Sequence, residues 1–518
     1  MQKRKPILKT QLLILTAAAL IGCNGTSSGN NAAPQPVYTT IFDAGSSGTR
    51  LSFYRVVPGN GSYPQINKLF EKEYNDNGIN DFLNGNGTIE LVDKNGQNML
   101  PNGARPANCN GGESEVNGQQ IQIINLGESD VGPCVLAPLL IAQDTALAES
   151  SLTRAQVKTE LFATAGMRTE DQRNGGSFTT AQISAYYQTM KTYVANMGFN
   201  TGEFKTINGN SEEGVWTWIN LNDYYYNIFG GNPTVSQTIQ PPVGDFEVGG
   251  SSMQIAFPTT TLQPSNESNV YSVTINGKHF NVYSKTILGL GGDDARKYVR
   301  AYGYSAQNGG LDCFATGATD NNTTEDSGIA LYPSTTLTPN IFPSNTVTTA
   351  PWFTLSSSQL NLTGAASFDL ATCSGEYDVV ESQVVSLARN NNGTYNEGST
   401  ATLVALKAAL QNSSSPFVGL DNFYYTADDL DVAESTGFNP TTLVNNLQTK
   451  CATTIAGNKL FQQAICANGT FMNSFLFGST NGLFNNSSAQ FSGVLPSKVN
   501  GVTVLTWTRG YLLQKYAN

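Results

Sequence analysis

Two short glycine turns, each preceded by a carboxylate, are the residues of this chain best suited to chemistry. Residues 38–54 read YTTIFDAGSSGTRLSFY and residues 243–257 read VGDFEVGGSSMQIAF, so that Asp43 and Glu247 superpose two residues before a glycine. Glycine lets backbone N–H groups approach an anion closely, and neighbouring hydroxyls add donors. The turns therefore predict phosphate binding through Ser46, Ser47, Gly48, Thr49, Gly249, Gly250 and Ser251.

The acid beside each turn predicts a metal ion. A carboxylate at this place would repel a bare phosphate, but a divalent cation lying between the two would be held by both. We therefore expect Mg²⁺ or Ca²⁺ near Asp43 and Glu247, mostly through water.

Both turns are expected to connect two alternating strands, which differs from the strand–loop–helix of a P-loop. The only Gly-Lys pair, Gly277-Lys278, is followed by His279 and completes no Walker motif. A single turn of this kind is typical of an ordinary hairpin, whereas two copies favour phosphate binding. The duplication suggests two related domains that close on one phosphate tail.

Composition excludes several classes of function. His279 is the only histidine, so a histidine-rich zinc site is excluded, and any Ser-His-Asp arrangement would rest on this residue alone. Only 13% of the residues are charged and 51 are glycine, which indicates a loop-rich extracytoplasmic protein. A net charge of −11 argues against a nucleic-acid partner.

The chain resembles the apyrase family, the nucleoside triphosphate diphosphohydrolases, from about residue 38 to its C-terminus. Four blocks carry the resemblance in the family's order, and weaker matches lie at residues 284–296, 421–426 and 506–513. The blocks are DAGSSGTR (43–50), ATAGMR (163–168), EEG (212–214) with Trp218 and Asn222, and EVGGSSMQ (247–254).

The resemblance implies an α/β, two-domain, actin-like (ribonuclease H-like) fold with mixed sheets and the active site in the interdomain cleft. It also implies an enzyme that releases the terminal phosphate from nucleoside tri- and diphosphates to give the monophosphate. We expect domain I at 37–205, completed by about 495–518, and domain II at 206–494.

The family's site residues are carried over by position. Glu213 matches the catalytic base that activates water, while Ser252 and Gln254 match residues that hold this water. Thr164 matches a phosphate contact, and Arg168 is expected to support its loop. Glu212 is expected to face solvent.

Two points of the resemblance are less direct. The fourth block usually begins with Asp, so Glu247 places its carboxylate one methylene further out, and Asp245 on the same strand face is a candidate substitute. The family stacks the nucleobase on aromatic side chains, for which Tyr424 and Tyr425 are the nearest candidates, although core tyrosines are an alternative interpretation.

Residues 1–23 read as a secretory signal with a basic start and a short apolar run that ends in LIGC. This ending resembles a bacterial lipobox, which would make Cys23 the lipid-bearing first residue, and residues 24–36 read as a flexible tether. We expect a lipid-anchored monomer in a bacterial cell envelope, at the outer membrane facing the periplasm or the surface. An ordinary signal peptide is the alternative.

The other six cysteines predict disulfides, since an even number in an exported chain is typical of them. Fifteen pairings are possible, and sequential pairing closes the shortest loops. It gives Cys109–Cys134, Cys313–Cys373 and Cys451–Cys466.

Two other functions remain open for this sequence. One is a polyphosphate or guanosine-pentaphosphate phosphatase of the same fold. The other is a surface lipoprotein that binds nucleotides or partners without turnover, which Glu247 favours and Glu213, Ser252 and Gln254 disfavour.

Overall fold

A computed structural model gives the structure of the chain. It describes residues 34–74, 78–91, 100, 106–116, 119–174, 177–231, 239, 241–296, 299, 311–318, 366–387, 403–411, 413–455, 460–479, 482–485 and 489–517. The expected signal peptide, Cys23 and most of the expected tether lie outside these residues. In the described part of the chain, no helix has the length and apolar character needed to cross a membrane.

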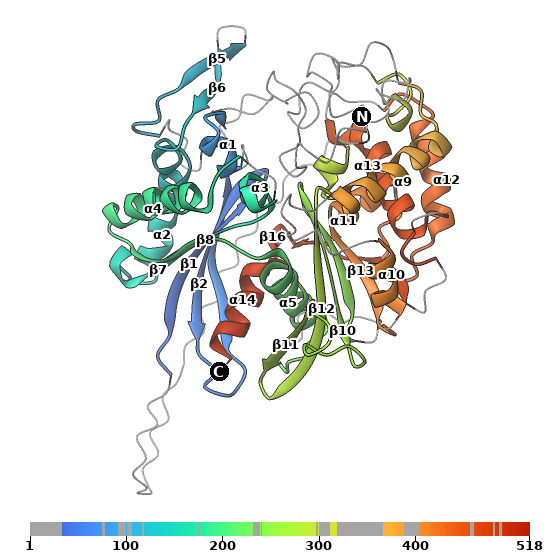
Figure 1. The fold of residues 1–518 in the computed structure, drawn as a ribbon. Coiled ribbons are helices and arrows are strands. Elements are labelled where there is room, and N and C mark those ends of the chain that lie inside the picture. The colour runs from blue at the N-terminus through green and yellow to red at the C-terminus, as the bar shows by residue number, and fades with distance from the viewer. Residues whose placement is uncertain are drawn as a thin grey trace, which may run out of the picture. The chain divides into compact units, whose positions relative to one another are not determined.

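The first sheet is built around the first glycine turn (Figure 1). Its strands in spatial order are β3 (Gln65–Tyr74), β2 (Gly48–Val57), β1 (Val37–Gly45), β7 (Lys158–Ala163) and β8 (Asn200–Thr206). β1 pairs antiparallel with β2 and parallel with β7, and β2 pairs antiparallel with β3. The middle of β1 is continuously buried, as is typical of a central strand covered on both faces.

The second sheet repeats this arrangement around the second turn. Its strands in spatial order are β11 (Val270–Ile275), β12 (Lys278–Leu288), β10 (Ser252–Thr259), β9 (Gly244–Val248), β13 (Pro416–Asp421) and β14 (Gln490–Val494). From β12 to β14 the order and directions match those from β3 to β8. The predicted duplication of the hairpin is therefore confirmed, while the boundary at residue 205 stays a prediction.

Each sheet has its own helices and its own core. The first packs with α2 (Ala137–Glu149) and α4 (Thr180–Asn196), and a three-stranded sheet lies beyond it: β4 (Gly87–Glu90), β6 (Gln119–Leu126) and β5 (Gly112–Val116). The second packs with helices that are mostly late in the chain: α9 (Leu370–Leu387), α10 (Leu403–Gln411), α11 (Asn422–Asp429), α12 (Pro440–Cys451) and α13 (Leu460–Phe477).

All three predicted disulfides are confirmed. Cys109–Cys134 fastens the segment before β5 to the π-helical turn η1 (Gly132–Leu136). The other two, Cys313–Cys373 and Cys451–Cys466, tie α9, α12 and α13 into the second core. All six cysteines of the described residues are therefore in disulfides.

Two helices far apart in the sequence lie between the two large sheets: α5 (Val215–Tyr224) and α14 (Trp507–Tyr516) (Figure 1). One buried cluster joins them to both sheets, because it contains Trp216 of α5 and Trp507 of α14 together with residues of β7 and β10. Arg509 of α14 donates to Asp223 of α5 at 2.6 Å. The two sheets are therefore connected by these two helices, which pack against both.

Helices α5 and α14 approach each other closely at Gly510. A Cβ at this position would lie 1.9 Å from the carbonyl oxygen of Trp216, a backbone atom that cannot rotate away. Gly375 in α9 is the opposite case, because a Cβ there meets nothing within 4 Å.

We predict that Gly510→Ala lowers the free energy of unfolding by about 3 kcal/mol, since α14 must move off α5. The matched control, Gly375→Ala, should be neutral or stabilise by up to about 1 kcal/mol, because alanine favours helix. Urea denaturation followed by circular dichroism measures both. Equal effects of the two substitutions would contradict the proposed contact.

Candidate active site

The first glycine turn closes β1 on β2, with Gly45 paired to Gly48. Helix α3 (Ala165–Glu170) begins against it, since a Cβ on Gly166 would lie 3.1 Å from the Cα of Ser46. Thr164, just before α3, donates its N–H to the carbonyl of Ala44 at 3.1 Å. Thr49 is buried, and its hydroxyl has no hydrogen-bond partner in the described part of the chain.

The second turn has its carbonyls occupied. Those of Gly249 and Gly250 accept N–H groups of Gly292 and Asp293 at 2.8 and 3.0 Å, and Asn422 also donates to Gly249 at 3.0 Å. With its acceptors tied to this neighbouring segment, the turn is suited to offer donors.

The two turns face each other at close range. A Cβ built on Gly250 would lie 2.7 Å from the Ser46 hydroxyl of the first turn and 2.9 Å from a carboxylate oxygen of Asp293. The structure therefore brings together two glycine turns that are about 200 residues apart, as the repeat predicted. A Cβ at 250 would make the Ser46 and Asp293 side chains move away.

Glu213 lies beside the second turn, in the π-helical turn η4 (Gly209–Gly214) that leads into α5. Asn208 begins η4, because its side-chain oxygen accepts the N–H groups of Asn210 and Ser211 at 3.0 and 2.8 Å. The buried Glu213 carboxylate accepts a hydrogen bond from Gln254 Nε2 at 3.1 Å, and the same nitrogen donates to Ser252 Oγ at 2.7 Å. Three predicted catalytic residues from two separate motifs thus form one hydrogen-bonded group.

Arg168 completes this group from the first sheet's side. Its guanidinium, 2% exposed, lies 2.6 Å from Glu213 Oε2, and the same nitrogen donates to Ser252 Oγ at 3.0 Å. A second nitrogen donates to the carbonyl of Ile207 at 3.3 Å. Arg168 therefore fixes the candidate base directly, which goes beyond the loop support expected from the sequence.

The expectation that Glu212 faces solvent is wrong. Its carboxylate pairs with Lys205 at 2.7 Å and accepts the N–H of Asn208 at 2.7 Å, with 24% of its side chain exposed. Glu212 therefore stabilises the start of η4, because it accepts the N–H of Asn208, the residue before that turn.

The two acids of the repeat are placed differently. Asp43 accepts a hydrogen bond from the Trp507 indole at 3.1 Å and lies 3.7 Å from Arg50. Burial raises the pKa of Asp43 to about 6, although both of these groups lower it. Glu247 accepts from Thr217 of α5 at 3.3 Å. Burial, followed by the carboxylates of Glu213 and Asp421, raises the pKa of Glu247 well above its usual range.

Asp245, the candidate substitute for Glu247, is more deeply buried than Glu247, and its role stays a prediction. One of its carboxylate oxygens accepts the N–H of Ala256 at 3.1 Å, and burial raises the pKa of this acid well above its ordinary value. It lies inside the sheet, 1% exposed.

The sequence reasoning missed Asp421. It ends β13 next to Val248 of β9, and burial raises its pKa to about 6, against the opposing charge of Arg50. Its φ of 53° is a conformation that costs energy outside glycine. The DNFYYT segment (421–426) carries the signal, because it begins with this aspartate.

The carboxylates suit a hydrated cation. No group of three or more Asp, Glu, His or Cys among the described residues could hold a metal ion directly. Asp43, Glu247 and Asp421 are nonetheless near enough for their charges to raise one another's pKa values, and carboxylate oxygens are the donors that a Mg²⁺ or Ca²⁺ ion would take, mostly through water.

The two candidate nucleobase residues differ in exposure. Tyr425 is 42% exposed, and the charges that affect its pKa include those of Asp421 and Arg50. Tyr424 packs against the second core, with its ring edge-on to Tyr425 at 5.6 Å between centroids. Tyr425 is thus the one that faces outward near the acids.

Comparison with known proteins identifies the family. The model of the GDA1/CD39 (nucleoside phosphatase) family matches residues 133–514. The chain belongs to this family. A nucleoside-triphosphatase of Caenorhabditis elegans is 27% identical over 269 residues, a match that covers 50% of this chain and only 39% of that protein.

A solved structure confirms the predicted fold. The crystal structure of a nucleoside triphosphate hydrolase from Neospora caninum superposes with a TM-score of 0.56 at 15% identity, covering 93% of this chain and 92% of that one. The family resemblance and the two-domain actin-like fold are therefore both confirmed. The roles of individual residues stay predictions.

The raised pKa of Asp421 gives a prediction for stability. An acid whose pKa is higher in the folded state makes the fold less stable as pH rises from about 4 to 6, because folding then opposes ionisation. Asp421→Asn should therefore raise the free energy of unfolding at pH 7.5, by at most about 3 kcal/mol, and leave it unchanged at pH 4. Denaturation at both pH values measures this, and a gain at pH 4 alone would contradict it.

Proposed function

We propose that this protein is a nucleotide phosphohydrolase that releases the terminal phosphate from nucleoside tri- and diphosphates to give the monophosphate. The observation that carries the proposal is the hydrogen-bonded group of Glu213, Gln254 and Ser252, which lies beside two facing glycine turns. Family membership supports the substrate class.

In this proposal the glycine turns hold the terminal phosphate, and Gln254 and Ser252 orient a water for in-line attack. The water oxygen bonds to phosphorus as the bond to the leaving phosphate oxygen breaks, and Glu213 takes the proton. Arg168 keeps the Glu213 carboxylate in place through their 2.6 Å ion pair. Asp43, Glu247 and Asp421 would hold a divalent cation, which would neutralise phosphate charge.

The setting is also a proposal. A signal sequence with lipid attachment at Cys23 would place the enzyme outside the cytoplasm, in a bacterial envelope. Tyr425 is the better placed of the two tyrosines to stack on a nucleobase, because its ring is exposed near the acids.

The first test is phosphate release from ATP and ADP by the full chain with Mg²⁺, with Ca²⁺ and with EDTA. We predict metal-dependent release from both nucleotides. Glu213→Gln should lower kcat on the order of a thousandfold, because the water loses its proton acceptor. Binding without release by the unchanged chain would instead favour a non-catalytic nucleotide-binding protein.

A second prediction concerns the longer carboxylate at 247. Thr217→Val should raise the metal concentration for half-maximal rate by about fivefold, since Glu247 loses its 3.3 Å hydrogen bond. In a Glu247→Asp background the same change should have no further effect, because the shorter side chain does not reach the hydroxyl. Additive effects of the two substitutions would show that Thr217 acts elsewhere.

A further inference from the structure

The start of helix α11 carries three residues of the candidate site. Asp421, the residue before the helix, ends β13 beside Val248 of β9. Asn422, the first residue of the helix, donates its side-chain N–H to the carbonyl of Gly249 in the second glycine turn at 3.0 Å. Tyr425 follows three positions later, and residues at this spacing lie on the same face of a helix. One short element thus carries a candidate cation ligand, a contact to a phosphate turn and the candidate ring for the nucleobase.

Another face of α11 is packed in the second core. Its buried residues are Phe423, Thr426 and Ala427. The ring of Phe423 lies 6.1 Å from that of Phe471 in α13, measured between centroids. Because α11 is a single helix of 8 residues, a displacement of Tyr425 also displaces Asn422. The helix can therefore transmit a change at the ring of Tyr425 to the contact that Asn422 makes.

The amide of Asn422 is closely enclosed by the second turn and the segment after β12. A Cβ on Gly292 of that segment would lie 3.0 Å from the Asn422 nitrogen. The carbonyl of Gly249, which accepts from Asn422, also accepts the N–H of Gly292 at 2.8 Å. These three residues form one close contact, so the position of the second turn depends on the position of α11.

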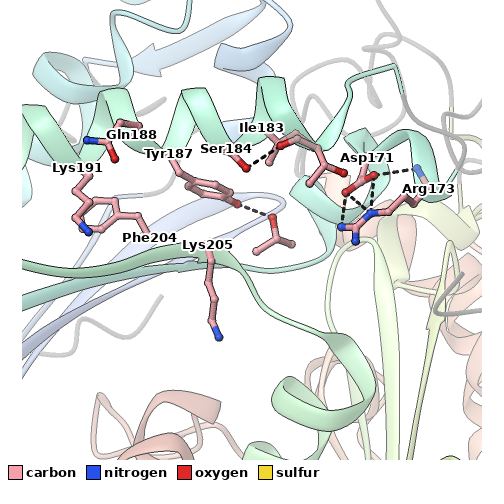
Figure 2. A pocket seen from close by; sticks show the side chains of 11 residues that line it. Asp171, Arg173, Ile183, Ser184, Tyr187, Gln188, Lys191, Phe204 and Lys205 are labelled. Carbon is pink, nitrogen blue, oxygen red and sulfur yellow. Dashed lines mark hydrogen bonds and ion pairs between the residues drawn. The ribbon is translucent and has the colours of Figure 1, made fainter. Parts of the chain in front are cut away.

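Aromatic side chains also line a cavity of about 280 Å³ along α4 and β8, but this cavity offers no comparable ring for a nucleobase (Figure 2). Its aromatic residues are Tyr187 and Phe204. Tyr187 is buried in the first core, and its hydroxyl hydrogen-bonds to that of Thr206 at 2.7 Å. Phe204 packs against the same core. Tyr425, which is exposed, is better suited to stacking.

We propose that α11 connects the nucleobase to the second glycine turn, with Asn422 as the positioning residue of this connection. A base stacked on Tyr425 fixes α11, and Asn422 then fixes the Gly249 carbonyl, so that the donors of the turn stay directed at the phosphate chain. The base thus adds its own contact and also orders the turn, which raises both affinity and rate. The effect on rate rests on the proposed function, whereas the effect on affinity needs no hydrolysis.

Calorimetric titration of the full chain with Mg²⁺ tests the connection through binding alone. The probes are the β,γ-imido analogue of ATP and imidodiphosphate, which has a similar phosphate end without the nucleoside. The unchanged chain should bind the nucleotide analogue more tightly, and Asn422→Ala should reduce this preference about tenfold. A residue that only held the turn would weaken the binding of both probes equally. That result, or no preference in the unchanged chain, would overturn the proposal.

Asn446→Ala is the matched control, because it removes a bond of the same kind at the opposite end of α11. Asn446 donates its side-chain N–H to the carbonyl of Leu430, the residue that ends this helix, at 2.8 Å. The two variants should unfold at nearly the same urea concentration, whereas only Asn422→Ala should change the preference for the nucleotide. The same loss of preference in both variants would overturn the proposal, because it would reflect the stability of the helix alone.

Steady-state kinetics with ATP and inorganic tripolyphosphate tests the effect on rate. Asn422→Ala should lower kcat for ATP about tenfold more than kcat for tripolyphosphate, since only ATP carries a base that orders the turn. A change in KM alone would contradict this part of the proposal. If the unchanged chain releases no phosphate from ATP, the proposed function fails, and the titrations still decide whether α11 connects the base to the turn.

Discussion

The dominant constraint on this structure is the concentration of negative charge at the place where a phosphate chain would bind. Asp43, Glu247 and Asp421 are all held where burial raises their pKa values. Burying an ionised carboxylate away from water lowers the stability of the fold, so folding alone would not select this arrangement. The cost is understandable if a cation and a polyphosphate share the site, because the acids then bind the cation and the cation binds the phosphate.

The duplicated hairpin explains how two sheets present matching groups. Five strands of each sheet have the same order, with the acid near the end of the middle one of the five and a glycine turn directly after it. The copies have diverged in what surrounds them. Asp43 is fixed by Trp507 of the last helix, whereas Glu247 is contacted by Thr217 of α5. Since α5 and α14 pack on each other between the sheets, both contacts depend on the same pair of helices.

The sequence predicted the parts of this site that lie within short motifs. The two turns, Glu213, Ser252 and Gln254 could be found because each belongs to a block of residues with a recognisable pattern, and the structure brings them together. The Trp507–Asp43 contact spans 464 positions, and no local pattern indicates it. Asp421 was missed for a related reason, since its importance comes from β13 lying beside β9. Glu212 was misjudged because its partner, Lys205, belongs to the preceding strand, and no pattern within the motif indicates a contact between the two.

The same packing explains Glu247, the residue at which the chain departs from the pattern that it resembles. A glutamate at 247 reaches one methylene further than the usual aspartate, and its carboxylate contacts Thr217, one helical turn after Glu213. Because Thr217 and Glu213 belong to one continuous helical segment, the acid of the second turn and the candidate base are positioned by the same element. Arg168 holds this segment from the side of the first sheet. A change in the separation of the two sheets would therefore move the base, the water-holding residues and Glu247 together, while Asp43 stays with the first turn.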